Sequence, residues 1–438
     1  MAQAAFDFNN HSHKRFNPLT NSWVLCSPHR TQRPWQGKRE DGDELDKRPS
    51  YDPSCYLCPR NTRANGGMLN PDYHDTFVFQ NDFPAVQQDQ PSLVPSKDSN
   101  PLLQVESVRG ECHVICFSPE HDKTLADMTE LEIRPVIDAW IDTYDSLKQK
   151  PHINHVQIFE NKGAAMGCSN PHPHGQVWST EDIPQEPAQE LVNMARYRKQ
   201  HSSCMLCDYV KTELETDLKA KAETAYAAAN ANGKATAATI AASAIDTGSV
   251  SEPSSPSSTS SSSGYLNEPL EPISTPTTTA TTTAEPQVHG VKPRTTPDGS
   301  RIVCENPSFV CVVPFWATWP FETMVLPKHH LARLSEMDAT QKEDLANILR
   351  RITCRYDNLF RCSFPYSMGI HQAPTNGDKD QEALSHLHLH FYPPLLRSAT
   401  VRKFLVGFEL LGQAQRDLTP EQAATRLAEC SEVHYRSA

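Results

Sequence analysis

The chain has 438 residues and a formal net charge of −12, a length that can bury one large core or two smaller ones. The acidic balance argues against a general nucleic-acid binder, whose contact surface is basic, and no apolar run is long enough to span a membrane. The N-terminal residues lack the apolar core of a secretory signal. Thirteen cysteines, an odd number, then indicate reduced thiols and metal ligands, so we expect a cytoplasmic protein.

The first predicted element is a short strand at 23–27, preceded by a turn and followed by a loop. That loop carries Arg30 and Arg33 between prolines. Guanidinium groups suit phosphate oxygens because they donate in pairs. The same residues also fit an ordinary solvated basic loop, and the local sequence leaves both interpretations open.

A C-x-x-C pair follows at Cys55 and Cys58, flanked by prolines. Such a pair is typical of a zinc knuckle or of a redox centre. The redox interpretation needs a thioredoxin-like βαβ context, which the surrounding residues do not show. Zinc needs two further ligands, for which His121 and His172 are the candidates. These four would form a closed, structural site.

Alternating apolar residues predict strands at 75–83, 110–119 and 155–161, with an amphipathic helix at 128–148 that Thr129 caps. The first of these strands ends in a polar turn of Asn81, Asp82 and Phe83. The carboxylate could accept from sugar hydroxyls and the ring could pack on a base. A simple strand-end cap explains the same three residues.

The stretch 167–178 contains the chemistry. His172, His174 and Gln176 alternate between prolines and a glycine, so an extended chain would project them together. A neutral imidazole can attack phosphorus without a strong base. Gln176 cannot transfer a proton, so a leaving group that needs none, such as a phosphate monoester, suits the site. The alternative is a metal site or loop histidines without catalysis.

The sequence next predicts a helix at 187–209 that carries a second C-x-x-C pair, Cys204 and Cys207. Residues 214–297 then pass from alanine-rich into serine- and threonine-rich sequence with almost no large apolar side chains. Burial cannot offset the entropy of ordering such a segment. We therefore expect a disordered insertion, with room for a frayed helix at its start.

The second half repeats the first. Strands at 301–304 and 309–327, a helix at 338–359 and a strand with paired histidines follow the order seen in 76–178, which indicates an internally duplicated α+β unit. His386, His388 and His390 alternate on one strand face. Three adjacent buried imidazoles each need partners, so a metal explains them better than packing. A closing helix is expected at 419–436, capped by Thr419.

Residues 163–176, which end in Ser-Asn-Pro-His-Pro-His-Gly-Gln, resemble the active-site signature of galactose-1-phosphate uridylyltransferases, a branch of the histidine-triad superfamily. The resemblance extends over nearly all of 13–213 and 298–438. It implies an α+β fold of duplicated histidine-triad-like units with antiparallel sheets and flanking helices. The expected divisions are an N-terminal half at 1–213, the disordered insertion at 214–297 and a C-terminal half at 298–438.

The resemblance implies a specific reaction. UDP-glucose and galactose 1-phosphate would exchange a uridylyl group through a covalent intermediate on His174, in two displacements, with Gln176 holding the phosphoryl group. The partners implied are these two substrates and a second copy of the chain, in a homodimer with shared active sites, with neither nucleic acid nor membrane. Substrate contacts are implied at Arg30, Arg33, Asn81, Asp82, Phe83, Asn161, Gly167, Cys168, Ser169, Gln176, Lys403, Phe404, Phe408, Glu409 and Gln415. Phe408 departs from the tyrosine that the family often has there.

Two metal sites are also implied. Zinc would be held by Cys55, Cys58, His121 and His172. A second divalent metal of iron type, structural in role, would be held by Glu190, His371, His388 and His390. The resemblance gives Cys204 and Cys207 no function, and we favour two free thiols; His386 has no assignment.

Two other functions compete with this one. A nucleotide hydrolase or phosphorylase of the same superfamily is one, although hydrolases favour histidine where this chain has Gln176. A metal-stabilised binding module without turnover is the other, and it would make Arg30, Asp82 and Lys403 coincidental.

Overall fold

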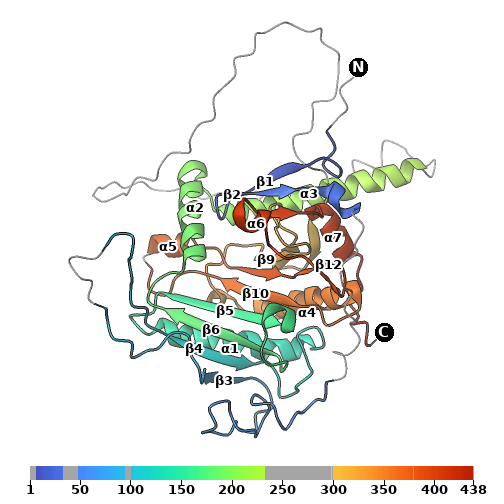
Figure 1. Ribbon diagram of the computed structural model, residues 1–438. Coiled ribbons are helices and arrows are strands. Elements are labelled where there is room, and N and C mark those ends of the chain that lie inside the picture. The colour runs from blue at the N-terminus through green and yellow to red at the C-terminus, as the bar shows by residue number, and fades with distance from the viewer. Residues whose placement is uncertain are drawn as a thin grey trace. The chain divides into compact units, whose positions relative to one another are not determined.

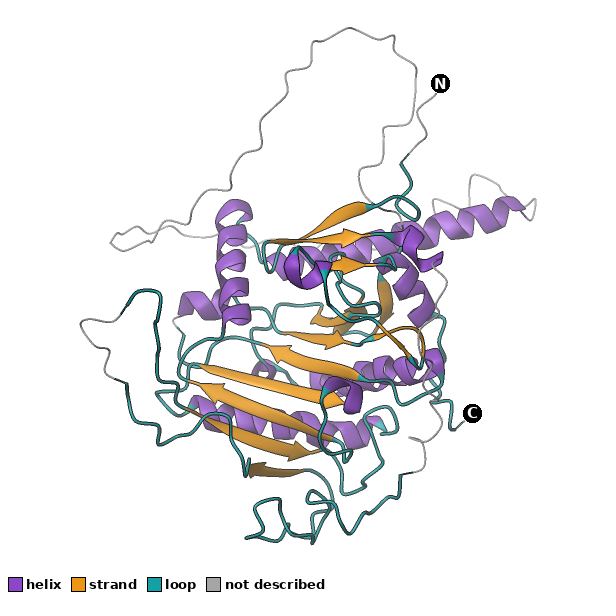
Figure 2. Ribbon diagram, viewed as in Figure 1, coloured by secondary structure: helices purple, strands orange, loops and turns teal. Residues whose placement is uncertain are grey.

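The computed structural model describes residues 6–32, 48–93, 100–231, 297, 299–377 and 379–437 (Figures 1 and 2). The chain divides into one unit of residues 1–221 and 298–438 and a second unit of residues 222–297. The fold below is that of the first unit. Most of the predicted insertion lies outside the described residues, as does Arg33; the described part of the insertion, 214–231, continues helix α3 (Met205–Ala231).

The first unit contains one nine-stranded antiparallel sheet in the order β3-β4-β6-β5-β10-β11-β9-β8-β7. The strands are β3 (Phe77–Gln80), β4 (Gly110–Cys116), β5 (His155–Lys162), β6 (His174–Thr180), β7 (Ile302–Glu305), β8 (Phe309–Val312), β9 (Thr323–Pro327), β10 (Tyr366–His371) and β11 (His388–Tyr392). The two halves of the chain meet where β5 pairs with β10. This arrangement confirms the predicted α+β class with antiparallel strands.

The duplication is visible in the order of elements. With α1 (Glu130–Lys148) and α4 (Ala339–Phe360), the first half runs β4-α1-β5-β6 and the second runs β9-α4-β10-β11. Within the sheet these strands lie in the orders β4-β6-β5 and β9-β11-β10. Strand β4 therefore corresponds to β9, and β6, which starts at His174, corresponds to β11, which starts at His388.

Helices α1 and α4 cover one face of the sheet. Their apolar stripes, with Ile137, Trp140, Ile348 and Ile352 fully buried, pack on the core face of the strands. Capping boxes start both helices, at Thr129 and at Asp338, because these side chains satisfy backbone donors that a helix start leaves unpaired. The opposite face of the sheet carries polar side chains at its centre.

Helices α2 (Gln185–His201) and α3 pack on that opposite face, over β7 to β9. Met194, Leu206 and Val210 share a second apolar cluster with Val310 and Met324. The single helix expected at 187–209 is wrong. Ser202 adopts a left-handed conformation (φ 57°) that ends α2, and α3 begins only at Met205, so Cys204 lies in the turn between two helices.

The remaining elements surround this sheet. They are β1 (His13–Asn17), β2 (Ser22–Cys26), β12 (Leu395–Ser398), β13 (Val401–Arg402), α5 (Lys379–Leu384), α6 (Phe408–Leu411), β14 (Gln415–Arg416) and α7 (Pro420–Ala428), with short 3-10 turns at Pro28–Gln32, Ala164–Met166 and Leu334–Glu336. Strands β1, β2 and β14 form a separate three-stranded sheet. Of the described residues, no helix combines the length and the apolar character needed to cross a membrane.

Helix α7 is shorter than the closing helix expected at 419–436. It starts with a capping box at Thr419 and ends at Ala428. The guanidinium of Arg355 donates to the carbonyls of Leu427, Ala428 and Cys430 at 2.9, 2.6 and 2.8 Å. These carbonyls therefore bond to a side chain from α4 where a longer helix would use its own backbone donors.

Candidate active site

His174 is the first residue of β6 and is oriented by its own loop. Its Nδ1 lies 2.8 Å from the carbonyl oxygen of His172. Because a carbonyl only accepts, Nδ1 carries the proton and Nε2 carries the lone pair. Burial lowers the pKa of His174 below its ordinary value, so the ring is neutral at pH 7. A neutral imidazole with a lone pair on Nε2 is a nucleophile.

Asn170 fixes the loop that leads to His174. Its Oδ1 accepts from the backbone N–H of His172 at 2.9 Å, and its Nδ2 lies 3.5 Å from the sulfur of Cys55. The Cys168 thiol donates to the Asn170 carbonyl at 2.9 Å. Asn170 lies within the signature at 163–176, but no role was predicted for it. Its amide connects the first cysteine pair to the backbone that orients His174.

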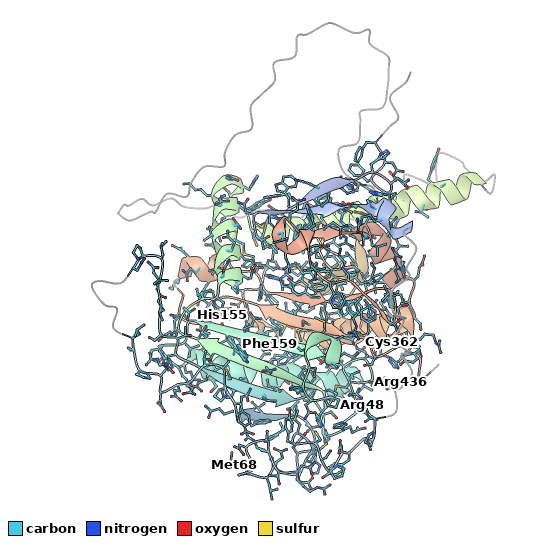
Figure 3. All side chains as sticks on the ribbon, in the orientation of Figure 1. Arg48, Met68, His155, Phe159, Cys362 and Arg436 are labelled. Carbon is cyan, nitrogen blue, oxygen red and sulfur yellow. The ribbon has the colours of Figure 1, made fainter. Side chains whose placement is uncertain are left out.

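A cavity of about 330 Å³ opens beside His174. Three of the predicted substrate residues, Asn161, Cys168 and Ser169, line it together with His174. Arg48 lines it as well and donates to the carbonyl of Pro171. Nothing in the surrounding sequence distinguishes Arg48 from a solvated arginine, so it was missed. Figure 3 labels it.

Two amide side chains near His174 have their oxygens engaged. The Oε1 of Gln176, two residues further along β6, accepts from Trp178 Nε1 at 3.2 Å. The Oδ1 of Asn161, on β5, accepts from the Ser367 hydroxyl at 2.7 Å. Both amides thus direct their NH₂ groups elsewhere as donors. Phe159, labelled in Figure 3, packs edge-on against Trp178 on the same sheet face, with ring centroids 5.6 Å apart.

Gly167 shapes this loop through its backbone conformation. It ends the 3-10 turn Ala164–Met166 in the left-handed region, with φ of 79°. A side chain there would be strained. The turn brings the chain back toward Cys168 and Ser169 on the cavity wall.

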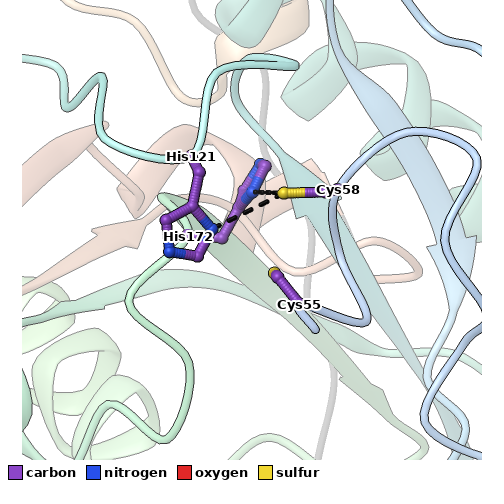
Figure 4. Close-up of side chains that lie close together, drawn as sticks. All are labelled: Cys55, Cys58, His121 and His172. Carbon is purple, nitrogen blue, oxygen red and sulfur yellow. Dashed lines mark hydrogen bonds between the residues drawn. The ribbon is translucent and has the colours of Figure 1, made fainter. Parts of the chain in front are cut away.

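The four predicted zinc ligands come together (Figure 4). Cys55, Cys58, His121 and His172 are all buried, with ligand atoms within 4.8 Å of one another. The sulfur of Cys58 lies 3.6 Å from His121 Nδ1 and 3.5 Å from His172 Nδ1. Tetrahedral zinc, with bonds of about 2.3 Å to sulfur and about 2.05 Å to nitrogen, separates such atoms by about 3.6 Å. The donor set and its spacing fit zinc.

A hydrogen bond and burial set the protonation of these ligands. His172 Nε2 donates to the carbonyl of Ser118 at 2.9 Å, which leaves Nδ1 to face the cysteines. Burial lowers the pKa of His172 to about 4 and also lowers that of His121, so both rings are neutral donors. Burial raises the pKa of the Cys58 thiol to about 12, and a bound cation would displace that proton.

The second predicted cluster also assembles. Glu190 from α2 faces three imidazoles: His371 Nδ1 at 2.9 Å, His388 Nε2 at 3.4 Å and His390 Nε2 at 3.8 Å. Burial alone would raise the pKa of Glu190, but His371 and His388 hold it well below its ordinary value. Burial lowers the pKa of His390 to about 3. Both buried nitrogens of His390 lack a hydrogen-bond partner among the described residues, and a divalent metal would satisfy one of them.

A third group was missed. The sulfurs of Cys204 and Cys207 lie with ring nitrogens of His330 and His386, again within 4.8 Å of one another. The sequence contained the C-x-x-C pair and the unassigned His386. The signal that could have identified the fourth member is the position of His330, which follows β9 as His121 follows β4.

Four of the predicted hexose-side and phosphate-side residues form one network. Lys403 Nζ donates to Gln415 Oε1 at 2.8 Å and contacts Glu409. Gln415 Nε2 and Arg30 Nε each lie 2.9 Å from Oδ1 of Asp417. Asp417, which the sequence did not single out, thus connects segments almost 400 residues apart. Phe404 and Phe408 nearby are 62% and 56% exposed. Among the described residues, none of this network lines the cavity beside His174.

The predicted base- and ribose-side turn lies at the end of β3. Asp82 is already held by Arg63, at 2.6 Å, and by Asn65, at 2.8 Å. The Oδ1 of Asn81 accepts from the N–H of Phe83 at 2.9 Å, and Phe83 is 71% exposed. Arg63 was missed, because its partner comes from a segment 19 residues away.

Two family models match this chain, the N-terminal domain of galactose-1-phosphate uridyl transferase over residues 4–184 and its C-terminal domain over residues 285–438. The chain belongs to the galactose-1-phosphate uridylyltransferase family. It is an enzyme of the transferase class. The galactose-1-phosphate uridylyltransferase of Saccharomyces cerevisiae is 44% identical over 447 residues, covering 99% of both chains. That of Haemophilus influenzae is 46% identical over 433 residues, covering 99% of this chain and 98% of its own.

Solved structures share the fold of this chain. An ADP-glucose phosphorylase from Arabidopsis thaliana, solved with ADP-glucose, aligns with a TM-score of 0.60 at 20% identity, over 96% of this chain and 99% of that one. A uridylyltransferase structure aligns with a TM-score of 0.60 at 21% identity, over 95% and 97%. At these identities the likeness concerns the fold alone.

Proposed function

We propose that this enzyme converts UDP-glucose and galactose 1-phosphate to UDP-galactose and glucose 1-phosphate through a uridylyl group carried on His174. The observation that carries the proposal is the hydrogen bond from His174 Nδ1 to the His172 carbonyl, 2.8 Å long. It assigns the lone pair to Nε2 in a ring whose pKa is lowered by burial. Membership of the family supports this choice of substrates.

The proposed reaction has two displacements. In the first, Nε2 of His174 attacks the α-phosphorus of UDP-glucose; a nitrogen–phosphorus bond forms and the bond to the glucose 1-phosphate oxygen breaks. The leaving phosphate takes the electron pair and needs no proton. In the second, a phosphate oxygen of galactose 1-phosphate attacks the same phosphorus, and the ring recovers its lone pair. Because neither leaving group needs a proton, no acid is required two residues beyond the nucleophile. An amide that only forms hydrogen bonds, Gln176, is sufficient there.

Positioning and charge stabilisation supply the catalysis in this proposal. The NH₂ groups of Gln176 and Asn161 would donate to the phosphoryl oxygens, since both amide oxygens are engaged elsewhere. Ser169 and the backbone at Cys168 would hold the second phosphate from the cavity wall, and the backbone of the adjacent Gly167 would also contact it.

The remaining predicted residues belong to the two ends of the substrates. Arg30 and Arg33 would contact phosphates, and Asn81, Asp82 and Phe83 would contact uridine. Lys403, Phe404, Phe408, Glu409 and Gln415 would bind the hexose. Because the Lys403 network does not line the cavity of its own chain, we further propose a homodimer in which each subunit supplies this network to its partner's His174. The exposed apolar run of Phe404, Val406, Phe408, Leu410 and Leu411 supports that assembly.

Two metals complete the proposal. Zinc at Cys55, Cys58, His121 and His172 would hold the nucleophile loop, and an iron-type divalent ion at Glu190, His371, His388 and His390 would join α2 to β10 and β11. Neither group would take part in the displacement. The protein's contribution at the first site is to fix His172, whose carbonyl orients His174.

Isotope exchange tests the double displacement. With galactose 1-phosphate left out, the enzyme should still exchange labelled glucose 1-phosphate into UDP-glucose, because the first displacement is reversible on its own. His174→Ala should abolish this exchange, whereas His329→Ala, an exposed histidine outside the site, should retain it. Turnover with both substrates but no exchange with one would refute the covalent route. Turnover with inorganic phosphate in place of the sugar phosphate would instead indicate a phosphorylase.

A further inference from the structure

The group of Cys204, Cys207, His330 and His386 draws on three separate parts of the chain. Cys204 lies in the turn before α3 and Cys207 lies in the first turn of that helix. His330 follows β9, and His386 lies two residues before β11. Residues this distant in sequence converge only because the fold brings them together.

The distances within the group are those of a tetrahedral site. His386 Nδ1 lies 3.4 Å from the sulfur of Cys204 and 3.5 Å from that of Cys207, and His330 Nδ1 lies 3.6 Å from the sulfur of Cys207. Ligands on one zinc ion, with bonds of about 2.3 Å to sulfur and about 2.05 Å to nitrogen, place sulfur and nitrogen about 3.6 Å apart. The cluster at Cys58 shows the same separations, 3.6 and 3.5 Å.

Hydrogen bonds explain this geometry less well. The single Nδ1 of His386 faces two sulfurs, and the single sulfur of Cys207 faces two imidazole nitrogens. A thiol has one proton to donate and a neutral ring nitrogen has one lone pair to accept it. Hydrogen bonding would satisfy only some of these approaches, whereas one cation at the centre satisfies all four residues.

The internal duplication gives an independent argument. In the first half, a C-x-x-C pair joins a histidine after β4 and a histidine two residues before β6. At the strands of the second half, the C-x-x-C pair at 204–207, which precedes β7 in the chain as the first pair precedes β3, joins a histidine after β9 and a histidine two residues before β11. Strands β4 and β9, and β6 and β11, are counterparts in the sheet. The third group is therefore the second-half counterpart of the first cluster.

The correspondence extends to the residue that follows. The carbonyl of His172 accepts from His174 Nδ1 at 2.8 Å, and the carbonyl of His386 accepts from His388 Nδ1 at 2.7 Å. In each half, a ligand of the cysteine cluster orients the histidine two residues later. In the first half that histidine is the proposed nucleophile; in the second half it is a ligand of the Glu190 cluster.

We propose that Cys204, Cys207, His330 and His386 form a third metal site that holds zinc, in addition to the two sites predicted from the sequence. Two thiolates and two imidazoles are a donor set that selects tetrahedral zinc. The site joins the start of α3 to the segments beside β9 and β11, and it fixes the backbone that orients His388. Because His330 is exposed and both cysteines are half-buried, whereas all four ligands of the first cluster are buried, this zinc exchanges faster than the first.

Cobalt substitution of the full chain counts the thiolate ligands directly. Thiolate-to-cobalt charge transfer reports the cysteine sites, and the Glu190 cluster contributes nothing to it. With cobalt at both cysteine clusters, the wild type has four thiolate ligands, so Cys204→Ser/Cys207→Ser should lose half of the band, and its zinc content should fall by one equivalent per chain. Cys430→Ser, a half-buried cysteine outside the clusters, should leave both unchanged. An undiminished band and an unchanged zinc content in the double variant would overturn the proposal.

If the double variant fails to fold, a variant at an exposed ligand tests the third metal site instead. His330→Gln and His329→Gln alter neighbouring exposed histidines, of which only the first belongs to the group. Loss of one ligand should lower the affinity for one zinc ion by more than about 10-fold. That figure is the smallest loss typical of mutating a residue that only hydrogen-bonds a metal ligand. A chelator should then remove one equivalent from His330→Gln faster than from His329→Gln. Equal removal rates would contradict a third site, and neither readout depends on uridylyl transfer.

Discussion

Replacing Asn170 by alanine should slow uridylyl transfer through a chain of hydrogen bonds that ends at His174. The change removes the acceptor of the His172 N–H, 2.9 Å away, and the donor beside Cys55. The His172 N–H is then left unpaired in a buried loop, which costs about 1–3 kcal/mol. Since the carbonyl of that same residue orients the His174 ring, a cost of this size in the transition state corresponds to a rate loss of about 5- to 150-fold.

Single-turnover release of glucose 1-phosphate from UDP-glucose measures this effect without the second displacement. Asn306→Ala is the matched control, because Asn306 also bonds backbone groups, at the turn between β7 and β8, but has no connection to His174. The control should lose stability and keep its single-turnover rate. An Asn170→Ala enzyme that is destabilised yet transfers uridylyl within about twofold of the wild-type rate would refute this orienting role.

Three further results are expected. Glu421→Gln should cost about 3 kcal/mol of unfolding free energy at pH 7, because Arg15 and Arg301 hold the pKa of this buried carboxyl at about 2, against an ordinary 4.5. The same shift predicts that the wild type loses this stability as the pH falls from about 4.5 toward 2, and that a chemical-denaturation series on the variant lacks that loss. Cys58→Ser should lower both the zinc content by one equivalent and the melting temperature, and unchanged zinc would exclude it as a ligand. Gln176→Ala should lower kcat about 10²- to 10³-fold, as loss of a transition-state donor does; a changed KM with unchanged kcat would exclude that role.

Local patterns in the sequence predicted the central strands and the C-x-x-C pair of the first metal cluster. Alternation placed His174 and Gln176 on one face of β6, and the apolar stripe with its Thr129 cap placed α1. Pro171 and Pro173 lie before the strand that begins at His174, because proline removes a ladder donor. These features depend on neighbours within a few residues, so a sequence records them directly.

Features without a local sequence signal, and those that depend on distant partners, were not predictable from the sequence. The left-handed Ser202 that divides 187–209 into two helices has no glycine to mark it. Helix α7 ends early because Arg355, more than 70 residues away, bonds its last carbonyls. The Asp417 link to Arg30 and the convergence of His330 with Cys207 likewise exist only after folding.

The direct test of the account is to load the enzyme with UDP-glucose alone, quench it, and locate the nucleotide by mass spectrometry of the intact chain and of its peptides. We predict one acid-sensitive uridine monophosphate per chain, attached to the peptide that contains residue 174, and its disappearance when galactose 1-phosphate is added before the quench. An enzyme that turns over both substrates but carries no adduct, or carries it on another residue, would contradict the proposed chemistry at His174.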